Sequence, residues 1–172
     1  MSGLRLAWAV APGGRAERRE RAWNLVRELL AREGHADAGL SNACPHCGGP
    51  HGPVTVTGAP WRASVSYAGG VVVIGIHPDT VSAFGIDAER LIDPVRDAAG
   101  GIEGGLLRWV RTEAVLKADG RGLRGDAVVE ITENGGQWTA HLPGAAGPFE
   151  GWEPVGPPGV LVSVAVSRGR RA

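Results

Sequence analysis

Two apolar runs, one in each half of the chain, constrain the fold of this protein more than any other feature. They are residues 70–76 (GVVVIGI) and residues 159–166 (GVLVSVAV). Short runs that are rich in β-branched residues and preceded by glycine are typical of strands buried in a sheet. Because the second run loosely resembles the first in its sequence of apolar residues, the pair suits a chain built from two similar lobes.

The segments around these runs predict a mixture of helices and strands. We expect an amphipathic helix over residues 15–32, where apolar side chains recur every three or four positions and Gly34 ends the pattern. A second helix is expected from about Glu103 to Ala118. Further strands are expected at residues 4–10, 61–65, 84–89, 126–132 and 137–141. The turn at residues 133–136 (ENGG) supplies the positive-φ residues that a tight hairpin needs.

The composition excludes several classes of function. Eighteen basic residues balance 18 acidic residues, so the net charge is zero and no overall field attracts nucleic acid or an anionic membrane. No stretch reaches the roughly 18 to 20 apolar residues of a membrane span. The apolar start lacks the cleavage pattern of a signal peptide, and the two cysteines provide no disulfide framework. We therefore expect a cytoplasmic protein that binds neither nucleic acid nor membranes.

Carboxylates recur in the second half of the chain at a spacing that predicts a metal site. Asp87 and Glu89 lie two positions apart in an expected strand, so both side chains point to one face. The second helix can bring Glu113 up to meet them. Three converging carboxylates form an oxygen-rich pocket for a hard divalent cation. Alone, Glu113 and Lys117 at i and i+4 would indicate an ordinary surface ion pair, but the other two carboxylates favour the metal site.

These carboxylates belong to a longer pattern, Gly-Ile-Asp-x-Glu at residues 85–89 followed by Trp-x-x-x-Glu-Ala-x-x-Lys-x-x-Gly-x-Gly-Leu at residues 109–123. The pattern resembles the signature of the 4′-phosphopantetheinyl transferases, in particular their monomeric surfactin-type branch. Residues 44–52 (CPHCGGPHG) and 63–69 (ASVSYAG) resemble two further segments of that family. The resemblance runs in order from about residue 18 to the end.

The resemblance implies a fold, a reaction and partners. The fold is α+β, with two pseudo-symmetric lobes at residues 1–80 and 81–172, each a small sheet packed on a long helix around a shared cleft. The reaction is Mg²⁺-dependent transfer of the 4′-phosphopantetheine arm of coenzyme A to a serine of an apo acyl or peptidyl carrier protein, as in secondary metabolite biosynthesis. A monomer suffices, because the cleft is complete within one chain.

The resemblance also implies roles for particular side chains. Asp87, Glu89 and Glu113 would hold Mg²⁺, directly or through water, and Glu113 would also accept the serine proton. Lys117 would lie against a coenzyme A phosphate as a point charge. Further candidates for contact with coenzyme A are Arg18, Ser66, Tyr67 and Arg111.

Three positions depart from the family pattern and weaken the predicted coenzyme A site. Thr112 stands where the family usually has lysine, Tyr67 where it has histidine, and Pro53 where it has lysine or arginine. Arg111 beside Thr112, the Tyr67 hydroxyl and Arg18 are possible replacements. The alternative interpretation is a divergent member that has lost transfer and binds a carrier protein or catalyses a different reaction.

The cysteines leave two interpretations open. Cys44 and Cys47, with His51 four positions later, have a spacing that can bind one zinc ion, with His35 or His46 as a fourth ligand. The other interpretation is a loop with two reduced thiols, and the family resemblance implies that this loop lines the coenzyme A site.

Overall fold

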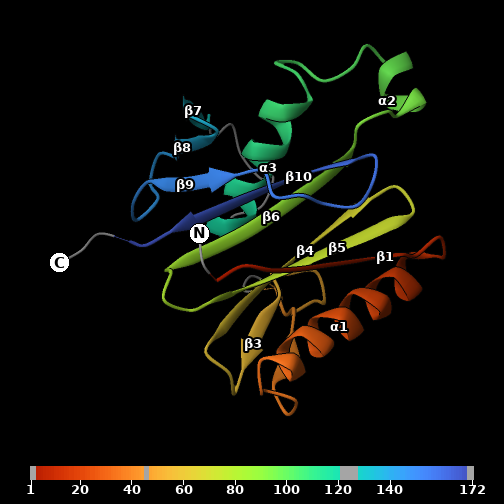
Figure 1. Cartoon of the computed structure of the whole chain (residues 1–172), viewed down its shortest axis with the longest axis vertical. Coiled ribbons are helices and arrows are strands. Elements are labelled where there is room, and N and C mark those ends of the chain that lie inside the picture. Colours follow the sequence, from red (N-terminus) through yellow and green to blue (C-terminus); the bar gives the residue numbers. More distant parts are fainter. Residues whose placement is uncertain (1–2, 45–46, 121–127, 170–172) are drawn as a thin grey trace.

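The computed structural model describes residues 3–44, 47–120 and 128–169, and within these ranges the protein is a mixed α+β structure with three sheets (Figure 1). The helices are α1 (Arg15–Arg32), α2 (Pro94–Ala98) and α3 (Leu106–Asp119). The strands are β1 (Arg5–Val10), β2 (Gly39–Ser41), β3 (Thr55–Thr57), β4 (Trp61–Ala68), β5 (Val71–Pro78), β6 (Ala83–Arg90), β7 (Glu130–Asn134), β8 (Gln137–His141), β9 (Phe149–Trp152) and β10 (Val160–Ser167).

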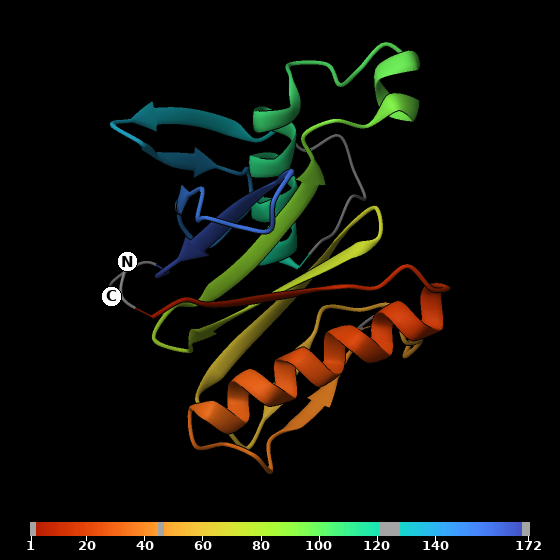
Figure 2. The same cartoon turned by 45° about the vertical axis from the view of Figure 1, so that its right-hand side comes forward.

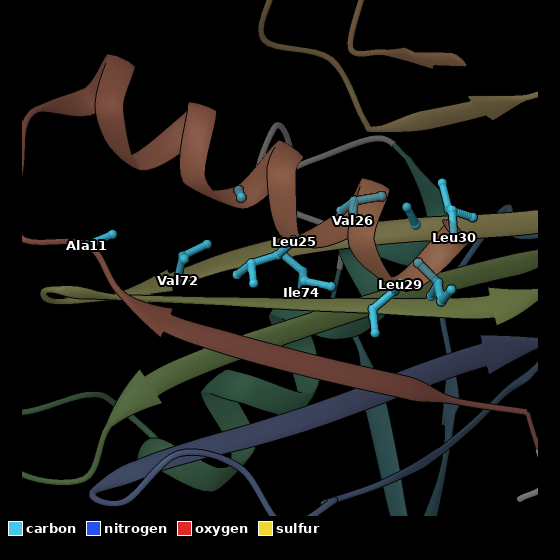
Figure 3. Packing of buried hydrophobic residues seen from close by; sticks show 10 residues of the cluster. Ala11, Leu25, Val26, Leu29, Leu30, Val72 and Ile74 are labelled. Carbon is cyan, nitrogen blue, oxygen red and sulfur yellow. The ribbon is translucent and has the colours of Figure 1, made fainter. Parts of the chain in front are cut away.

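The first sheet is antiparallel, has the strand order β1-β5-β4, and lies under α1. Leu25, Val26, Leu29 and Leu30 recur at helical spacing on one face of α1 and are all buried. Figure 3 shows this stripe facing Ile74 and its neighbours on the sheet. The helix predicted over residues 15–32 is therefore confirmed, because its apolar stripe has a sheet to pack against.

The second sheet is antiparallel, has the strand order β6-β10-β9-β8-β7, and packs against α3. The run at residues 159–166 supplies β10, which pairs with β6 over its whole length. The predicted hairpin between β7 and β8 is confirmed, with Gly135 and Gly136 at φ values of 57° and 84°. A small third sheet pairs β2 with β3.

The two larger sheets share a core. Ala68 and Val73 from the first sheet join Phe84, Ile86 and Val164 from the second in one buried cluster. Figure 2 shows α1 on one side of the two sheets and α3 on the other, with β4, β5 and β6 between them. Alternate residues of β6 therefore face two different partners, the first sheet on one side and α3 on the other.

Facing edges of these two sheets are linked by side chains. β4 ends the first sheet and β6 ends the second. The Ile86 N–H donates to the Ser64 hydroxyl at 3.0 Å, and the Ala88 N–H donates to the Ser66 hydroxyl at 3.2 Å. Serine hydroxyls thus satisfy two edge N–H groups of β6 that no strand partner on that side would otherwise reach.

Four short elements were not expected from the sequence: β2, β3, β9 and α2. The strand expected at residues 126–132 is found as β7 at Glu130–Asn134, and residues 126–127 lie outside the described ranges. Among the described residues, no helix has the length and apolar character to cross a membrane.

Candidate functional site

Strand β6 and helix α3 bring together the residues of the predicted metal site. Asp87 and Glu89 lie on the same face of β6 as Gly85, the face that packs on α3. A Cβ atom at Gly85 would lie 2.4 Å from the Ala114 carbonyl oxygen and 2.4 Å from the Ala118 nitrogen. With no side chain between strand and helix, the backbones approach closely enough for Asp87 to meet side chains of α3.

Three elements converge on the Asp87 carboxylate. The Lys117 ammonium donates to Asp87 Oδ1 at 2.6 Å and to the Ser66 hydroxyl at 2.9 Å. Ser66 Oγ donates to the same Asp87 oxygen at 2.8 Å. Asp87 and Ser66 are buried, whereas the Lys117 side chain is 31% exposed. A serine of β4, an aspartate of β6 and a lysine of α3 therefore form one hydrogen-bonded group.

Glu113 and Glu89 belong to the same electrostatic cluster. The pKa of Glu113 is raised to about 7, chiefly by burial and further by the negative charges of Asp87 and Glu89, while Lys117 lowers it. Burial and Asp87 also raise the pKa of Glu89, against a hydrogen bond from Trp109 that lowers it. The negative charges of the cluster therefore disfavour ionisation of Glu89 and Glu113.

Two oxygens of this cluster lack a hydrogen-bond partner. They are Asp87 Oδ2 and Glu113 Oε1, both buried. A buried carboxylate oxygen without a donor costs free energy, and such oxygens are the ligands that hard divalent cations prefer. The chemistry of these two oxygens therefore suits a hard divalent cation. The donor atoms of Asp87, Glu89 and Glu113 are not gathered within 4.8 Å of one another, a limit met among the described residues by Cys44, Cys47 and His51.

A cleft of about 1060 Å³ adjoins the cluster. Its walls come from α1, β4, the loop between β2 and β3, and the C-terminal end of α3. Lys117 lines this cleft and hydrogen-bonds Asp87, whereas the three carboxylates do not line it. Lys117 therefore connects the cleft to the carboxylate cluster.

Cations dominate the charged lining of the cleft. Arg15, Arg18 and Arg19 line it from α1. The Arg18 guanidinium lies 5.9 Å from the centroid of the Tyr67 ring, and its buried Nε has no hydrogen-bond partner. Burial raises the Tyr67 pKa while these three arginines lower it. Converging guanidinium groups and an unpaired donor suit an anionic ligand.

Of the residues predicted to contact coenzyme A, Arg18, Tyr67 and Lys117 line the cleft, whereas Ser66 does not line it but accepts a hydrogen bond from Lys117. Arg111 is different. Its buried guanidinium donates to Glu153 at 2.9 and 3.0 Å and to Glu133 at 2.6 Å.

Arg111 does not line the cleft, and its contact with coenzyme A stays a prediction. Hydrogen bonds to Glu153 raise its pKa, and its donors are committed to carboxylates of the second sheet. Arg111 and Glu113 lie two positions apart on α3, about 200° around the helix, so they face different sides. Glu153, which also accepts from Trp138 and Ser163, carried no recognisable signal in the sequence.

Arg15 and Arg19 were not among the predicted site residues. They stand with Arg18 at i, i+3 and i+4 positions, which places all three on one face of α1. That spacing is the signal that identifies them. Pro53 lines the cleft, but Thr112 does not. Gly122 and Leu123 of the sequence pattern lie outside the described residues.

No protein-family model matches the sequence, and no curated protein matches it.

Proposed function

We propose that this protein transfers the 4′-phosphopantetheine arm of coenzyme A to a serine of an apo acyl or peptidyl carrier protein. The observation that carries the proposal is the pair of buried, unpartnered oxygens on Asp87 and Glu113, beside a lysine that opens onto an arginine-lined cleft. A metal-binding acidic cluster next to a cationic cleft suits a substrate with several phosphate groups.

The fold supports the proposal at a coarser level. A helix packs on each of the two larger sheets, and the cleft is lined by β4 and α1 of one half and by α3 of the other. This arrangement is compatible with the two-lobed phosphopantetheinyl transferase fold that the sequence pattern implies. The cationic cleft would receive the nucleotide and pyrophosphate of coenzyme A, and the reacting phosphorus would lie near Lys117.

Asp87 and Glu113 would hold Mg²⁺, with Glu89 beside them. When bound there, the ion supplies positive charge that offsets the charge of the pyrophosphate. Lys117 adds a second positive charge on the side that faces the cleft. In such a displacement the protein acts mainly by positioning groups and neutralising charge.

Glu113, which does not line the cleft, would accept the proton of the attacking serine through an intervening water. A general base works best when its pKa is near the working pH, and the pKa of Glu113 is raised to about 7. The serine oxygen forms a bond to the phosphorus that carries pantetheine. The bond from that phosphorus to the bridging oxygen of the pyrophosphate breaks, and adenosine 3′,5′-bisphosphate leaves.

Intact-protein mass spectrometry of apo carrier proteins tests the proposal. After incubation with the protein, coenzyme A and Mg²⁺, we expect a phosphopantetheine-sized mass gain on at least one carrier. The gain should disappear with Asp87→Asn and persist with Glu130→Gln, which changes an exposed acid of β7. No gain on any carrier that a competent enzyme modifies would refute transfer.

A second function has one observation in its favour. Tyr67 lines the cleft beside Arg18, at the position where the resembled family uses histidine. A repurposed site would bind carrier protein without transfer, or act on a tethered intermediate. Calorimetry separates the two functions, because this alternative predicts carrier binding with weak or no coenzyme A binding.

A further inference from the structure

The loop between β2 and β3 carries a group of ligand atoms that the proposed transfer does not use. The sulfurs of Cys44 and Cys47 and a ring nitrogen of His51 all lie within 4.8 Å of one another. Cys47 Sγ and His51 Nε2 are 3.4 Å apart. In a tetrahedral zinc site the Zn–S and Zn–N bond lengths place sulfur and nitrogen about 3.5 Å apart. The side chains therefore lie near the spacing that zinc requires.

Backbone hydrogen bonds hold this arrangement in place. The Cys44 N–H donates to the Gly49 carbonyl, and the Gly48 N–H donates to the Cys44 carbonyl, each at 2.8 Å. The Gly52 N–H donates to the Asn42 carbonyl at 2.8 Å, which brings the two ends of the loop together. The loop thus folds back on itself and aligns the two thiols with the imidazole.

Gly49 makes room for the ligand side chains. A Cβ atom there would lie 3.0 Å from the His51 ring and 3.3 Å from Cys47 Sγ. These distances are tight, so an alanine would require the imidazole and the thiol to move by a few tenths of an ångström. The bare backbone at Gly49 allows both ligands to approach from one side.

Apart from these hydrogen bonds, the described part of the loop has few contacts that fix its position. Within residues 43–44 and 47–53, no residue belongs to a buried apolar cluster. Its contacts with the rest of the protein include Arg19, which donates to the Pro50 carbonyl at 2.9 Å. Yet Cys44 and His51 form part of the cleft wall. We propose that Cys44, Cys47 and His51 bind one Zn²⁺ ion, which fixes this loop as a wall of the cleft.

The proposed ion has a structural role. Binding converts two thiols to thiolates and releases two protons, so the bound unit of Zn²⁺, two thiolates and neutral imidazole carries no net charge. The bound unit therefore makes the cleft wall more rigid without adding net positive charge to the cleft. Structural zinc sites usually have four protein ligands, so water would complete the coordination of these three. His35 does not join the group, and His46 lies outside the described residues.

Cobalt substitution tests the site without coenzyme A or carrier protein, so its result is independent of the transfer reaction. After removal of metal by a chelator under reducing conditions, Co²⁺ should bind at one equivalent. We expect near-ultraviolet charge-transfer absorption from thiolate to cobalt and intense visible bands of a tetrahedral site. One equivalent of Zn²⁺ should abolish these bands and protect both thiols from a thiol-reactive reagent.

Variants assign the ligands. Cys44→Ser and Cys47→Ser should each lose the charge-transfer band or most of its intensity, and Gly49→Ala should weaken binding at least tenfold. His35→Ala, which removes the remote histidine, should bind cobalt like the unmodified protein. Each variant is checked by far-ultraviolet circular dichroism, which should not change because the loop lies outside the cores.

Two results would overturn the proposal. One is a folded, reduced protein that shows no charge-transfer band at excess Co²⁺. The other is an unchanged band in both serine variants. Limited proteolysis gives a further readout: cleavage within residues 42–54 should be slower in the zinc-loaded protein than in the chelator-treated protein, and equal rates would remove the structural role.

Discussion

Ser66 joins the two halves of the protein through a single hydroxyl group. Its Oγ accepts the Ala88 N–H and the Lys117 ammonium and donates to Asp87. Ser66→Ala leaves these groups without that partner, so we expect the free energy of unfolding to fall by about 1–3 kcal/mol. Urea denaturation measures this loss.

Ser64→Ala is the matched control for Ser66→Ala. Ser64 also accepts an N–H group of β6, but no hydrogen bond joins it to Asp87 or Lys117 among the described residues. Both variants should lose similar stability, whereas transfer and coenzyme A binding should fall much further in Ser66→Ala. Equal functional losses would show that Ser66 only supports the fold.

Glu113 predicts a pH dependence of stability. Its pKa rises from 4.5 to about 7 on folding, so the folded protein holds this proton more tightly than the unfolded chain. The resulting stabilisation is fully present below about pH 4.5 and is lost as the pH rises to about 7, by on the order of 3 kcal/mol. Chemical denaturation across this range in a chelator should show the loss, and Glu113→Gln should largely remove it.

Mg²⁺ should counteract this loss of folding stability at higher pH. The ion and the proton compete for Glu113, so Mg²⁺ should raise the melting temperature more at about pH 7.5 than at about pH 5. An equal effect at both pH values, or an undiminished effect in Glu113→Gln, would place the ion elsewhere.

At the scale of elements, Gly85 sets the distance between β6 and α3. A methyl group there would collide with the backbone at Ala114 and Ala118. Gly85→Ala should destabilise the protein by about 1–3 kcal/mol and should also reduce Mg²⁺ affinity, because the helix carries Glu113 and Lys117. Gly70→Ala is the control: the nearest atom outside its chain neighbours is 3.9 Å away, and its φ is not positive.

The long elements could be predicted from the sequence because each buries a periodic apolar face. The α1 stripe of Leu25, Val26, Leu29 and Leu30 and the apolar run of β10 carry that signal. Strands β2 and β3 have three residues each, too short for a period, and β9 (FEGW) has a glycine that admits the Trp138 ring. That fit depends on packing between distant segments.

The candidate site shows the same division. Alternation along β6 and helical spacing along α3 are local properties, so the common face of Asp87 and Glu89 and the i, i+4 spacing of Glu113 and Lys117 could be expected. The hydrogen bond from Ser66 to Asp87 depends on how the two sheets pack. The placement of Arg111 depends on Glu153, which lies 42 positions away in the chain. Spacing in the sequence does not show which distant residue a side chain will contact in the folded protein.

At the scale of the whole molecule, the shared core predicts cooperative unfolding. Val73 of the first sheet and Val164 of the second belong to one buried cluster. Neither sheet can lose its structure without exposing the other. Hydrogen exchange in increasing denaturant should therefore give one midpoint for amides of α1 and of β10. Two separate midpoints would show that the halves fold independently.

The cleft predicts which arginine matters most for an anionic ligand. Arg18 lines the cleft and has a buried, unpaired Nε. Arg18→Ala should weaken coenzyme A binding by roughly tenfold to a hundredfold in calorimetry, the range for hydrogen bonds to charged groups. Arg21→Ala, an exposed arginine of α1 that does not line the cleft, should change the affinity little.

The serine contacts between β4 and β6 have a consequence for how such a protein can change. In a continuous sheet the strands are joined by backbone peptide groups, and every residue type except proline supplies both the N–H and the C=O. Here the two β6 edge N–H groups are bonded by the side chains of two serines, so a single substitution can remove either bond while the shared core remains. Substitutions at these two positions, in evolution or in design, can therefore change how firmly the two halves are held together.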